Sequence, residues 1–264
     1  MNPPDTARLH VLDGGRIDVL DWSVFDPGAP AGEKRTLADP CYLIRHPGGT
    51  LLWDTGVGDD IALEPNGRTV QDVAVFHVET RLAAQLGEIG LRPDDVTHLA
   101  LSHLHPDHIG NVALFPGATL LIQQDEYESV FGPDADPGAY EALGLETLRN
   151  NPLRLLRGDL DVFGDGTTVI KRFPGHTVGS QSLLMRLAGG TVLISGDLAH
   201  STGNWAGRVV PALNVDAGRT RESMRAAAEL IVDEHATLWI QHELSQFTTL
   251  RRGREHYDLG MHAK

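Results

Sequence analysis

The sequence predicts an α/β protein in which two β-rich halves stack as a sandwich and helices cover the outer faces. Two observations predict this class. The order of segments runs from strand-rich to helix-containing twice, once in each half of the chain. In both halves, strand-like segments end in histidine or aspartate, so the strand ends of two stacked sheets would meet on one rim. We therefore expect polar side chains from distant parts of the sequence to gather there.

Length and composition fit a single globular domain that spans residues 1–264. A chain of 264 residues can bury a sizeable core as one large domain or two small ones, and no low-complexity linker divides it. The contents of 41% hydrophobic and 22% charged residues are ordinary for a globular protein. A formal net charge of −14 disfavours a nucleic-acid backbone or an anionic membrane as the main partner. The sequence leaves the oligomeric state open, a homodimer included.

Cysteine usage and hydropathy constrain the compartment. The only cysteine is Cys41, so neither an internal disulfide nor a thiolate-rich metal site can form. Residues 1–6 contain no basic segment followed by an apolar one, and no apolar run approaches the roughly 18 residues of a membrane span. We therefore expect a cytoplasmic protein with no membrane association.

Strands dominate the first 80 residues. Apolar runs bounded by glycine-containing turns predict two hairpins, Leu9–Leu12 with Ile17–Leu20 and Cys41–His46 with Thr50–Trp53. Residues 23–39 and 57–78 are richer in polar residues and are interpreted as loops. A loop as long as the second one usually has a function, so we expect it to form a lid or a pocket wall.

Helical and strand-like segments alternate in the rest of the chain. Apolar residues three and four apart predict helices, whereas short aliphatic or β-branched runs predict strands. Helices are expected at Thr80–Ile89, Gln124–Phe131, part of Tyr140–Asn150, and Arg219–His235. Strands are expected at Val96–Leu101, Thr119–Ile122, Ile170–Phe173, Gln181–Arg186, Thr191–Ile194 and Thr237–Ile240.

One short stretch places three imidazoles and a carboxylate directly after a predicted buried strand: Ser102-His103-Leu104-His105-Pro106-Asp107-His108. His103 and His105 can project together from an extended segment, because its side chains repeat with a period of two. Asp107 and His108 follow Pro106, which favours a turn and lets them point at a second position. Imidazole nitrogens and carboxylate oxygens suit zinc, and also iron, manganese or cobalt. The stretch therefore predicts a metal site.

Four further strand ends present ligand-type residues, namely Asp54, His176, Asp197 and His242. The resulting motifs resemble the metal-binding motifs of the metallo-β-lactamase superfamily, in the order found there: His103 to His108, Pro174-Gly175-His176-Thr177, Ser195-Gly196-Asp197 and Gln241-His242. The resemblance covers residues 9–242. Within the superfamily, the chain is most similar to the N-acyl homoserine lactonase and 4-pyridoxolactonase branch, with methyl parathion hydrolase as a neighbour.

This resemblance implies an αβ/βα four-layer sandwich with a dinuclear metal site. One metal would be bound by His103, His105 and His176, and the other by Asp107, His108 and His242, with Asp197 bridging them. Seven ligands are too many for one tetrahedral zinc, but they suit two metal ions about 3.5–4 Å apart that share a carboxylate. The expected cofactors are therefore two divalent metal ions, with zinc favoured over iron, manganese or cobalt.

Three neighbouring residues have less specific signals. Asp54 is expected to hold a ligating histidine or the turn backbone rather than to bind a metal. His98, inside the strand before the motif, is interpreted as packed core. His200 stands three residues after Asp197, where the acyl homoserine lactonases have a tyrosine that contacts the substrate carbonyl. An imidazole could donate a similar hydrogen bond, and a solvent-exposed loop histidine is the alternative.

The resemblance favours an enzyme, a dinuclear metal-dependent hydrolase that opens lactones such as N-acyl homoserine lactones or cleaves related carboxylic esters. A hydroxide bridging the metals would attack the carbonyl, and Asp107 would pass a proton to the leaving alkoxide. His200 is the second candidate catalytic residue. An apolar pocket wall, or else buried core, is expected from Trp22, Phe25, Phe76 and Trp205.

The main alternative is an aryl esterase or phosphotriesterase, similar to methyl parathion hydrolase, on the same dinuclear site. β-Lactam hydrolysis is less favoured, because Asp197 fits a metal-bridging aspartate rather than the lactamase pattern. An iron redox enzyme would need a carboxylate at His105 and a flavin domain, and RNA processing would need a basic face. A purely structural metal site would be closed and four-coordinate. The expected partner is thus a small-molecule lactone or ester.

Overall fold

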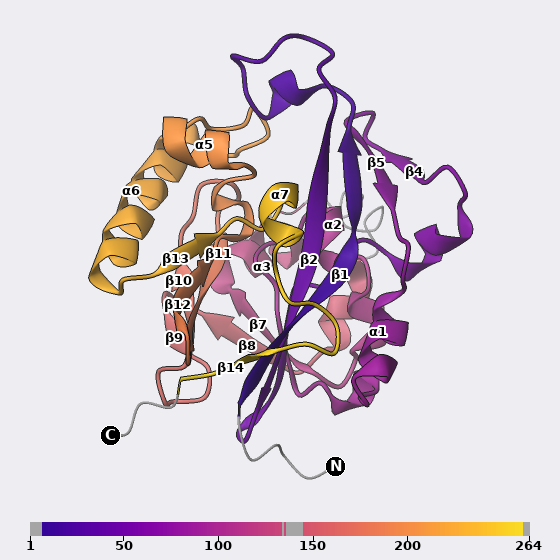
Figure 1. The fold of residues 1–264 in the computed structure, drawn as a ribbon, viewed down its shortest axis with the longest axis vertical. Helices are drawn as coiled ribbons and strands as arrows, with labels where there is room; N and C mark the ends of the chain where they lie inside the picture. Colours follow the sequence, from indigo (N-terminus) through magenta and orange to yellow (C-terminus); the bar gives the residue numbers. More distant parts are fainter. Residues whose placement is uncertain (1–6, 134, 136–144, 261–264) are drawn as a thin grey trace.

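The computed structural model describes residues 7–133, 135 and 145–260, and the strands in these ranges form two sheets (Figure 1). The nine-stranded sheet contains, in spatial order, β4 (Arg68–Val70), β5 (Ala74–His77), β1 (Arg8–Val19), β2 (Arg35–His46), β3 (Gly49–Trp53), β6 (His98–Ala100), β7 (Thr119–Gln123) and β8 (Leu153–Leu156), while β14 (Tyr257–Asp258) pairs with the start of β1. The five-stranded sheet contains β13 (Thr237–Trp239), β12 (Gly190–Ile194), β11 (Gln181–Leu187), β10 (Thr168–Arg172) and β9 (Leu160–Asp161).

Helices connect the strands and cover the outer faces of both sheets. The α-helices are α1 (Leu82–Glu88), α2 (Pro106–Ile109), α3 (Gln124–Phe131), α5 (Thr202–Gly207), α6 (Ala217–Asp233) and α7 (Leu244–Phe247). The 3₁₀ helices are η1 (Trp22–Val24), η2 (Asp59–Leu63), η3 (Pro93–Asp95), η4 (Val112–Leu114), η5 (Leu145–Asn150) and η6 (Gly196–Leu198). The long helix α6 begins after Asp216, whose carboxylate accepts the backbone N–H of Arg219 and so caps the first turn.

The core is divided into layers that fit an α/β sandwich. Between the sheets, Ile44 and Trp53 of the first sheet pack in one buried cluster with Leu183 and Ile194 of the second. On the outer face of the first sheet, a second cluster joins its strands to α1, whereas a third joins the outer face of the second sheet to Met224 of α6. Figure 1 shows α6 and α1 on opposite sides of the molecule. This arrangement confirms the predicted sandwich with helices outside.

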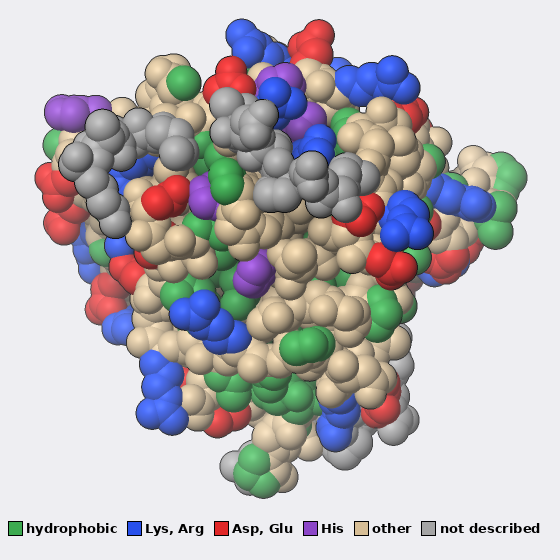
Figure 2. Space-filling model, turned by 90° about the horizontal axis from the view of Figure 1, so that it is seen from below, with side chains coloured by type: hydrophobic (Ala, Val, Ile, Leu, Met, Phe, Trp, Pro, Cys, Tyr) green, Lys and Arg blue, Asp and Glu red, His purple; other side chains and the backbone are tan. Residues whose placement is uncertain are grey.

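The surface is mixed in charge on the face that Figure 2 displays. Acidic and basic side chains are interspersed there rather than separated by sign. Within the described ranges, none of the helices has both the length and the apolar character that a membrane crossing would require.

Most of the predicted elements are present, but the first hairpin is wrong. The second hairpin is confirmed, since β2 pairs antiparallel with β3. Instead of two strands and a turn, residues 8–19 form the single strand β1, and its pairing with β2 shifts register between Asp13 and Arg16. Gly15 has a φ of 135° at this shift. A glycine pair therefore produces a β-bulge here, because both halves of the strand find partners in the same sheet.

Segments interpreted as loops also contain strands. β2 begins at Arg35, inside residues 23–39, and the 57–78 segment contains the hairpin of β4 and β5. This hairpin pairs with β1 through β5, so a long-range partner fixes a segment whose own pattern is weak. Three predicted helices are confirmed: the one at Thr80–Ile89 as α1, the one at Gln124–Phe131 as α3, and the one at Arg219–His235 as α6. Of the part-helical segment, residues 140–144 lie outside the described residues and 145–150 form η5.

Candidate metal centre

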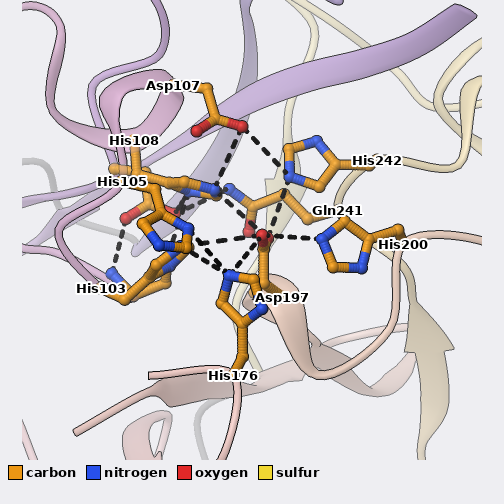
Figure 3. Close-up of polar contacts among 12 residues, drawn as sticks. His103, His105, Asp107, His108, His176, Asp197, His200, Gln241 and His242 are labelled. Atoms are coloured by element: carbon orange, nitrogen blue, oxygen red, sulfur yellow. Dashed lines mark hydrogen bonds and ion pairs between the residues drawn. The ribbon is translucent and has the colours of Figure 1, made fainter. Parts of the chain in front are cut away.

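Strand ends from both sheets meet at one rim and bring the predicted ligands together (Figure 3). β3 and β6 are parallel neighbours, as are β12 and β13, so the residues that follow them lie side by side. The first sheet contributes two residues after β6 and two in α2, where Pro106 occupies the first helical turn: His103, His105, Asp107 and His108. The second sheet contributes one residue between β10 and β11, one in η6 and one after β13: His176, Asp197 and His242.

Four of these residues form what we call the first group: His103, His105, His176 and Asp197. Each offers one nitrogen or oxygen atom that lies within 4.8 Å of the others. Nε2 of His176 is 3.1 Å from Nε2 of His103 and 2.9 Å from Nδ1 of His105. Oδ2 of Asp197 lies 3.1 Å from the same His176 nitrogen. Three imidazole nitrogens and a carboxylate oxygen therefore converge on one point.

The remaining three residues form the second group: Asp107, His108 and His242. Oδ2 of Asp107 is 3.6 Å from Nε2 of His108 and 3.7 Å from Nε2 of His242. Oδ1 of Asp197 lies 3.2 Å and 2.9 Å from the same two nitrogens. Asp197 thus directs one oxygen at each group, which is the arrangement expected of a residue shared between two ions.

Burial and charge act in opposite directions on the protonation of these groups. Burial lowers the pKa of His103 well below its usual value and lowers that of His105 to about 3, so both offer neutral nitrogens. Burial also acts to lower the pKa of His242, but the Asp197 carboxylate outweighs it and raises the pKa to about 9. Burial acts to raise the pKa of Asp197, yet the neighbouring imidazoles, His200 and His242 first, hold it well below the usual range. Asp197 is thus held as a negatively charged carboxylate, which favours positively charged groups beside it.

This donor set fits two divalent cations better than it fits mutual hydrogen bonding. Nε2 of His108 is buried and makes no hydrogen bond within the described residues, although Oδ1 of Asp197 lies 3.2 Å away. Nε2 of His176 faces two other ring nitrogens, and neutral imidazoles cannot all donate to one another. Converging lone pairs of this kind are the ligands that zinc and related cations take.

Contacts behind the ligands fix how the imidazoles are oriented. Oδ2 of Asp54 lies 2.9 Å from Nδ1 of His108, and its Oδ1 accepts the Ser102 N–H at 2.6 Å. Nδ1 of His242 is 2.8 Å from the carbonyl of Ala38. Each contact leaves Nε2 of the ring pointing at the centre. Both roles expected for Asp54, holding a histidine and holding the turn backbone, are therefore confirmed as contacts.

Two other histidines differ from expectation. His200 is only 2% exposed, so the alternative of a surface loop histidine is wrong. Its Nε2 lies 3.0 Å from Oδ2 of Asp197, and its Nδ1 is buried with no hydrogen-bond partner in the described part of the chain. His98, interpreted as packed core, is instead half-buried, with its ring edge-on to Phe163 at 6.0 Å. β6 lies near the surface there, which residue pattern alone did not indicate.

A cavity of about 280 Å³ opens beside the two groups. Among the polar residues that line it are His105, Asp107, His176, Asp197, His200 and His242. Its apolar wall includes Phe25, Ile17, Leu37 and Leu213, together with Val70, Val73 and Phe76 from the β4–β5 hairpin. The expectation that residues 57–78 form a pocket wall is thus confirmed, as are the positions of Phe25 and Phe76.

The other two candidate wall residues have different surroundings. Trp22 is fully buried and stacks behind Phe25, with ring centroids 5.1 Å apart, so it belongs to the core. Trp205 packs against the buried cluster under α6. Nothing in the local sequence around either tryptophan distinguishes a wall residue from a core residue.

Two polar residues next to the ligands were missed by sequence reasoning. Gln241 donates from Nε2 to Oδ2 of Asp54 at 2.7 Å, which supports the same carboxylate that orients His108. Glu126 of α3 is 2% exposed and accepts hydrogen bonds from two backbone amides near the ligands. Gln241 could have been found from its place beside His242, but no local signal marks Glu126.

Comparison with known proteins agrees with this geometry. The sequence model of the metallo-beta-lactamase superfamily matches residues 37–242. This range contains all seven members of the two groups. The chain belongs to the metallo-beta-lactamase superfamily.

Relatives and solved structures extend the likeness over nearly the whole chain. An N-acyl homoserine lactonase AttM from Rhizobium radiobacter is 32% identical, over 95% of this chain and 98% of its own length. A solved N-acyl homoserine lactone hydrolase with N-hexanoyl-L-homoserine at its catalytic metal centre matches with a TM-score of 0.80 at 24% identity, covering 95% of this chain and 99% of that one. AidC, a dizinc quorum-quenching lactonase, matches with a TM-score of 0.68 at 20% identity, over 90% and 88%. The predicted metallo-β-lactamase fold is confirmed.

Proposed function

We propose that this protein is a dinuclear metal-dependent hydrolase that opens lactone rings, with N-acyl homoserine lactones as its substrate class. One observation carries the proposal: the two oxygens of Asp197 face different ligand groups beside a cavity with an apolar wall. The relative named N-acyl homoserine lactonase, which this chain matches along nearly its whole length, supports that substrate class. The apolar wall suits an acyl chain, and the polar side suits the lactone.

The ligand groups define which residues would hold the metals. We infer that the first group binds one divalent ion, the second group binds the other, and Asp197 is shared. Five imidazoles and two carboxylates are compatible with zinc, which we take as the metal. When bound, such a pair of ions lowers the pKa of water toward about 7 and polarises a carbonyl oxygen. Both sheets supply ligands, so we also infer that residues 1–264 act as one domain.

We assign proton transfer to Asp107. Hydrolysis breaks the ring C–O bond of the lactone, forms a new bond from water oxygen to the carbonyl carbon, and leaves an alkoxide that must take up a proton. The Asp107 carboxylate belongs to the second group and also lines the cavity, and its side chain is 16% exposed. It can therefore accept the proton that water loses and deliver it to the alkoxide oxygen without leaving the site.

We assign to His200 a hydrogen bond to the substrate oxygen that becomes negative. His200 lines the cavity, and its buried Nδ1 cannot reach substrate, so the donor would be the Nε2–H. The same nitrogen lies 3.0 Å from Oδ2 of Asp197, which favours the Nε2–H tautomer, so this one N–H would be shared between the Asp197 carboxylate and the substrate oxygen. Phe25 packs edge-on against the ring at 5.0 Å and limits its rotation. A donor fixed in this way costs little reorganisation as charge develops.

A substrate panel on metal-quantified protein tests the proposal. The panel contains N-acyl homoserine lactones of several chain lengths, aryl esters, phosphotriesters and β-lactams. We expect the highest kcat/KM for the acyl homoserine lactones, with loss of activity on chelation and recovery on adding zinc. Dominant turnover of aryl esters or phosphotriesters would reject the lactonase assignment in favour of the esterase alternative. Absence of any metal-dependent turnover would reject both.

A further inference from the structure

Glu126 is a buried carboxylate that the proposed reaction does not use. It lies in the first turn of α3, on the outer side of the nine-stranded sheet, and is 2% exposed. Its Oε1 accepts the backbone N–H of Leu104 at 3.0 Å, and its Oε2 accepts the backbone N–H of Gly179 at 2.9 Å. Burial raises the pKa of the Glu126 carboxyl. Hydrogen bonds from Thr177, Gly179 and Leu104 act in the opposite direction and limit this rise. Both oxygens are therefore engaged, each by a different loop.

The two amides belong to the two loops that supply the imidazoles of the first group. Leu104 stands between His103 and His105, so the position of its amide constrains both neighbouring side chains. Gly179 follows His176 by three residues in the loop between β10 and β11. These loops come from different sheets, and their imidazole nitrogens must converge to within about 3 Å. One carboxylate thus joins the two sides of the first group.

The fit between α3 and the His176 loop is close enough to require glycine. A Cβ added to Gly179 would lie 2.5 Å from Cβ of Glu126 and 2.7 Å from its backbone nitrogen. Real Cβ atoms do not approach so closely, so any larger residue would push the loop away from the helix. The short distance between α3 and the loop therefore depends on both residues: Gly179 leaves the space, and Glu126 accepts its N–H.

The second group is held by other contacts. Asp54 orients His108, and the carbonyl of Ala38 orients His242. No hydrogen bond joins Glu126 to either of these residues in the described part of the structure. A change at Glu126 should therefore affect the two groups unequally, which separates a positioning role from a general contribution to folding.

We propose that Glu126 is a positioning residue that sets the distance between the His103–His105 pair and His176, and so determines the metal affinity of the first group alone. The inference rests on the proposed dinuclear function. Glu126 does not touch substrate or metal; it acts through the two loops.

Metal titration of the full chain tests this inference. Chelator-treated protein is titrated with Zn²⁺ against a chromophoric competitor, and we expect two binding steps in the unmodified protein. Variants His105→Ala and His242→Ala identify which step belongs to the first and which to the second group. Glu126→Gln keeps the shape of the side chain but turns one acceptor into a donor facing an N–H. We expect it to weaken the step that His105→Ala weakens by about 10–100-fold and to leave the other unchanged.

Glu128→Gln is the matched control. It removes the same charge from the same helix, but Glu128 is exposed, and among the described residues its carboxylate accepts a hydrogen bond from the side chain of Gln124. We expect both Zn²⁺-binding steps of Glu128→Gln to have the same affinities as those of the unmodified protein. Melting curves of the metal-free variants measure any effect on folding separately from metal affinity.

The outcomes separate the two proposals. A single step, or none, in the unmodified protein would reject the dinuclear function itself. Two normal steps in Glu126→Gln, or equal weakening of both, would overturn the positioning role while leaving the function intact. If Glu126→Gln does not fold, Glu126→Asp retains two acceptor oxygens on a side chain one methylene shorter. Selective weakening of the first-group step in that variant would support the inference, and an unchanged titration would overturn it.

Discussion

Asp54, which directly follows β3, places its carboxylate 2.9 Å from Nδ1 of His108 in α2. The two residues are 54 positions apart in the sequence. The second carboxylate oxygen of Asp54 accepts the N–H of Ser102, the residue that opens the ligand stretch. Burial acts to lower the pKa of His108, but the carboxylates of Asp107, Asp197 and Asp54 outweigh it and raise the pKa well above its usual value. The pair therefore fixes both the direction of the imidazole and the backbone turn that carries the other ligands.

Replacing Asp54 should weaken metal binding moderately, whereas replacing Asp107 should nearly abolish turnover. Asp54 has a φ of 57°, which asparagine tolerates, so Asp54→Asn retains the backbone, removes the charge and turns one acceptor oxygen into a donor facing an N–H. We expect a cost of about 10–100-fold in metal affinity or activity. Asp107→Asn changes a residue that we propose as both metal ligand and proton carrier, and should lower kcat by orders of magnitude. Steady-state kinetics with metal analysis compares the two; equally small effects would mean that Asp107 has no such role.

The protein should contain two metal ions per chain. The seven proposed ligand residues divide into two groups that share Asp197, so elemental analysis of protein purified without chelator should give close to two equivalents. Asp197→Asn should reduce occupancy of both sites, because one oxygen of Asp197 faces each group. Full activity at a reproducible single equivalent would contradict the dinuclear site.

Removing the His200 imidazole should slow lactone opening mainly through kcat. Its proposed hydrogen bond strengthens only as charge builds on the substrate oxygen, so KM should change little. The loss for His200→Ala should be at most about 2.7–4 kcal/mol in the activation barrier, the worth of one such donor. His200→Tyr should recover activity on acyl homoserine lactones, and His200→Phe, which has the bulk without the donor, should not. Unchanged lactone turnover in His200→Ala would remove this residue from the mechanism.

Stability in acid should depend on the ionised carboxylate of Asp165, whose contact with His46 links the two sheets. Oδ2 of Asp165 lies 2.8 Å from Nε2 of His46. Burial acts to raise the pKa of Asp165, but hydrogen bonds from Thr167 and His46 outweigh it and lower the pKa below its ordinary value of 3.8. A carboxylate with a lowered folded-state pKa stabilises the protein above its unfolded-state pKa, and this contribution disappears as the pH falls through the folded value.

Asp165→Asn should therefore be less stable than the unmodified protein near neutral pH, and the difference should shrink in acid. Urea unfolding at several values from about pH 7 to about pH 3 measures the change in the free energy of unfolding. Glu229→Gln, on the exposed side of α6, is the control and should show no such dependence. A difference that stayed constant across this range would show that the ionised carboxylate does not contribute.

The ligand stretch and its family were accessible from sequence because they depend on local spacing. His103, His105, Asp107 and His108 fall within six residues, so alternation along an extended segment and a proline-led turn are enough to group them. The strand ends that carry His176, Asp197 and His242 are also local features, since each follows a short segment with a strand-like pattern. The residue pattern predicts two stacked sheets, and in such a fold these strand ends are expected to meet at one rim.

Only the tertiary structure decided the contacts between segments far apart in sequence. The bulge that makes β1 continuous depends on partners in β2 and β5, and the strand pairing of residues 68–77 depends on β1. The link from Glu126 to Gly179 spans 53 residues, and neither residue carries a local signal of it. Burial of His200 likewise depends on which rings surround it. Composition and periodicity determine which face of an element is apolar, but the neighbour of a given buried polar atom is set by the packing of whole elements.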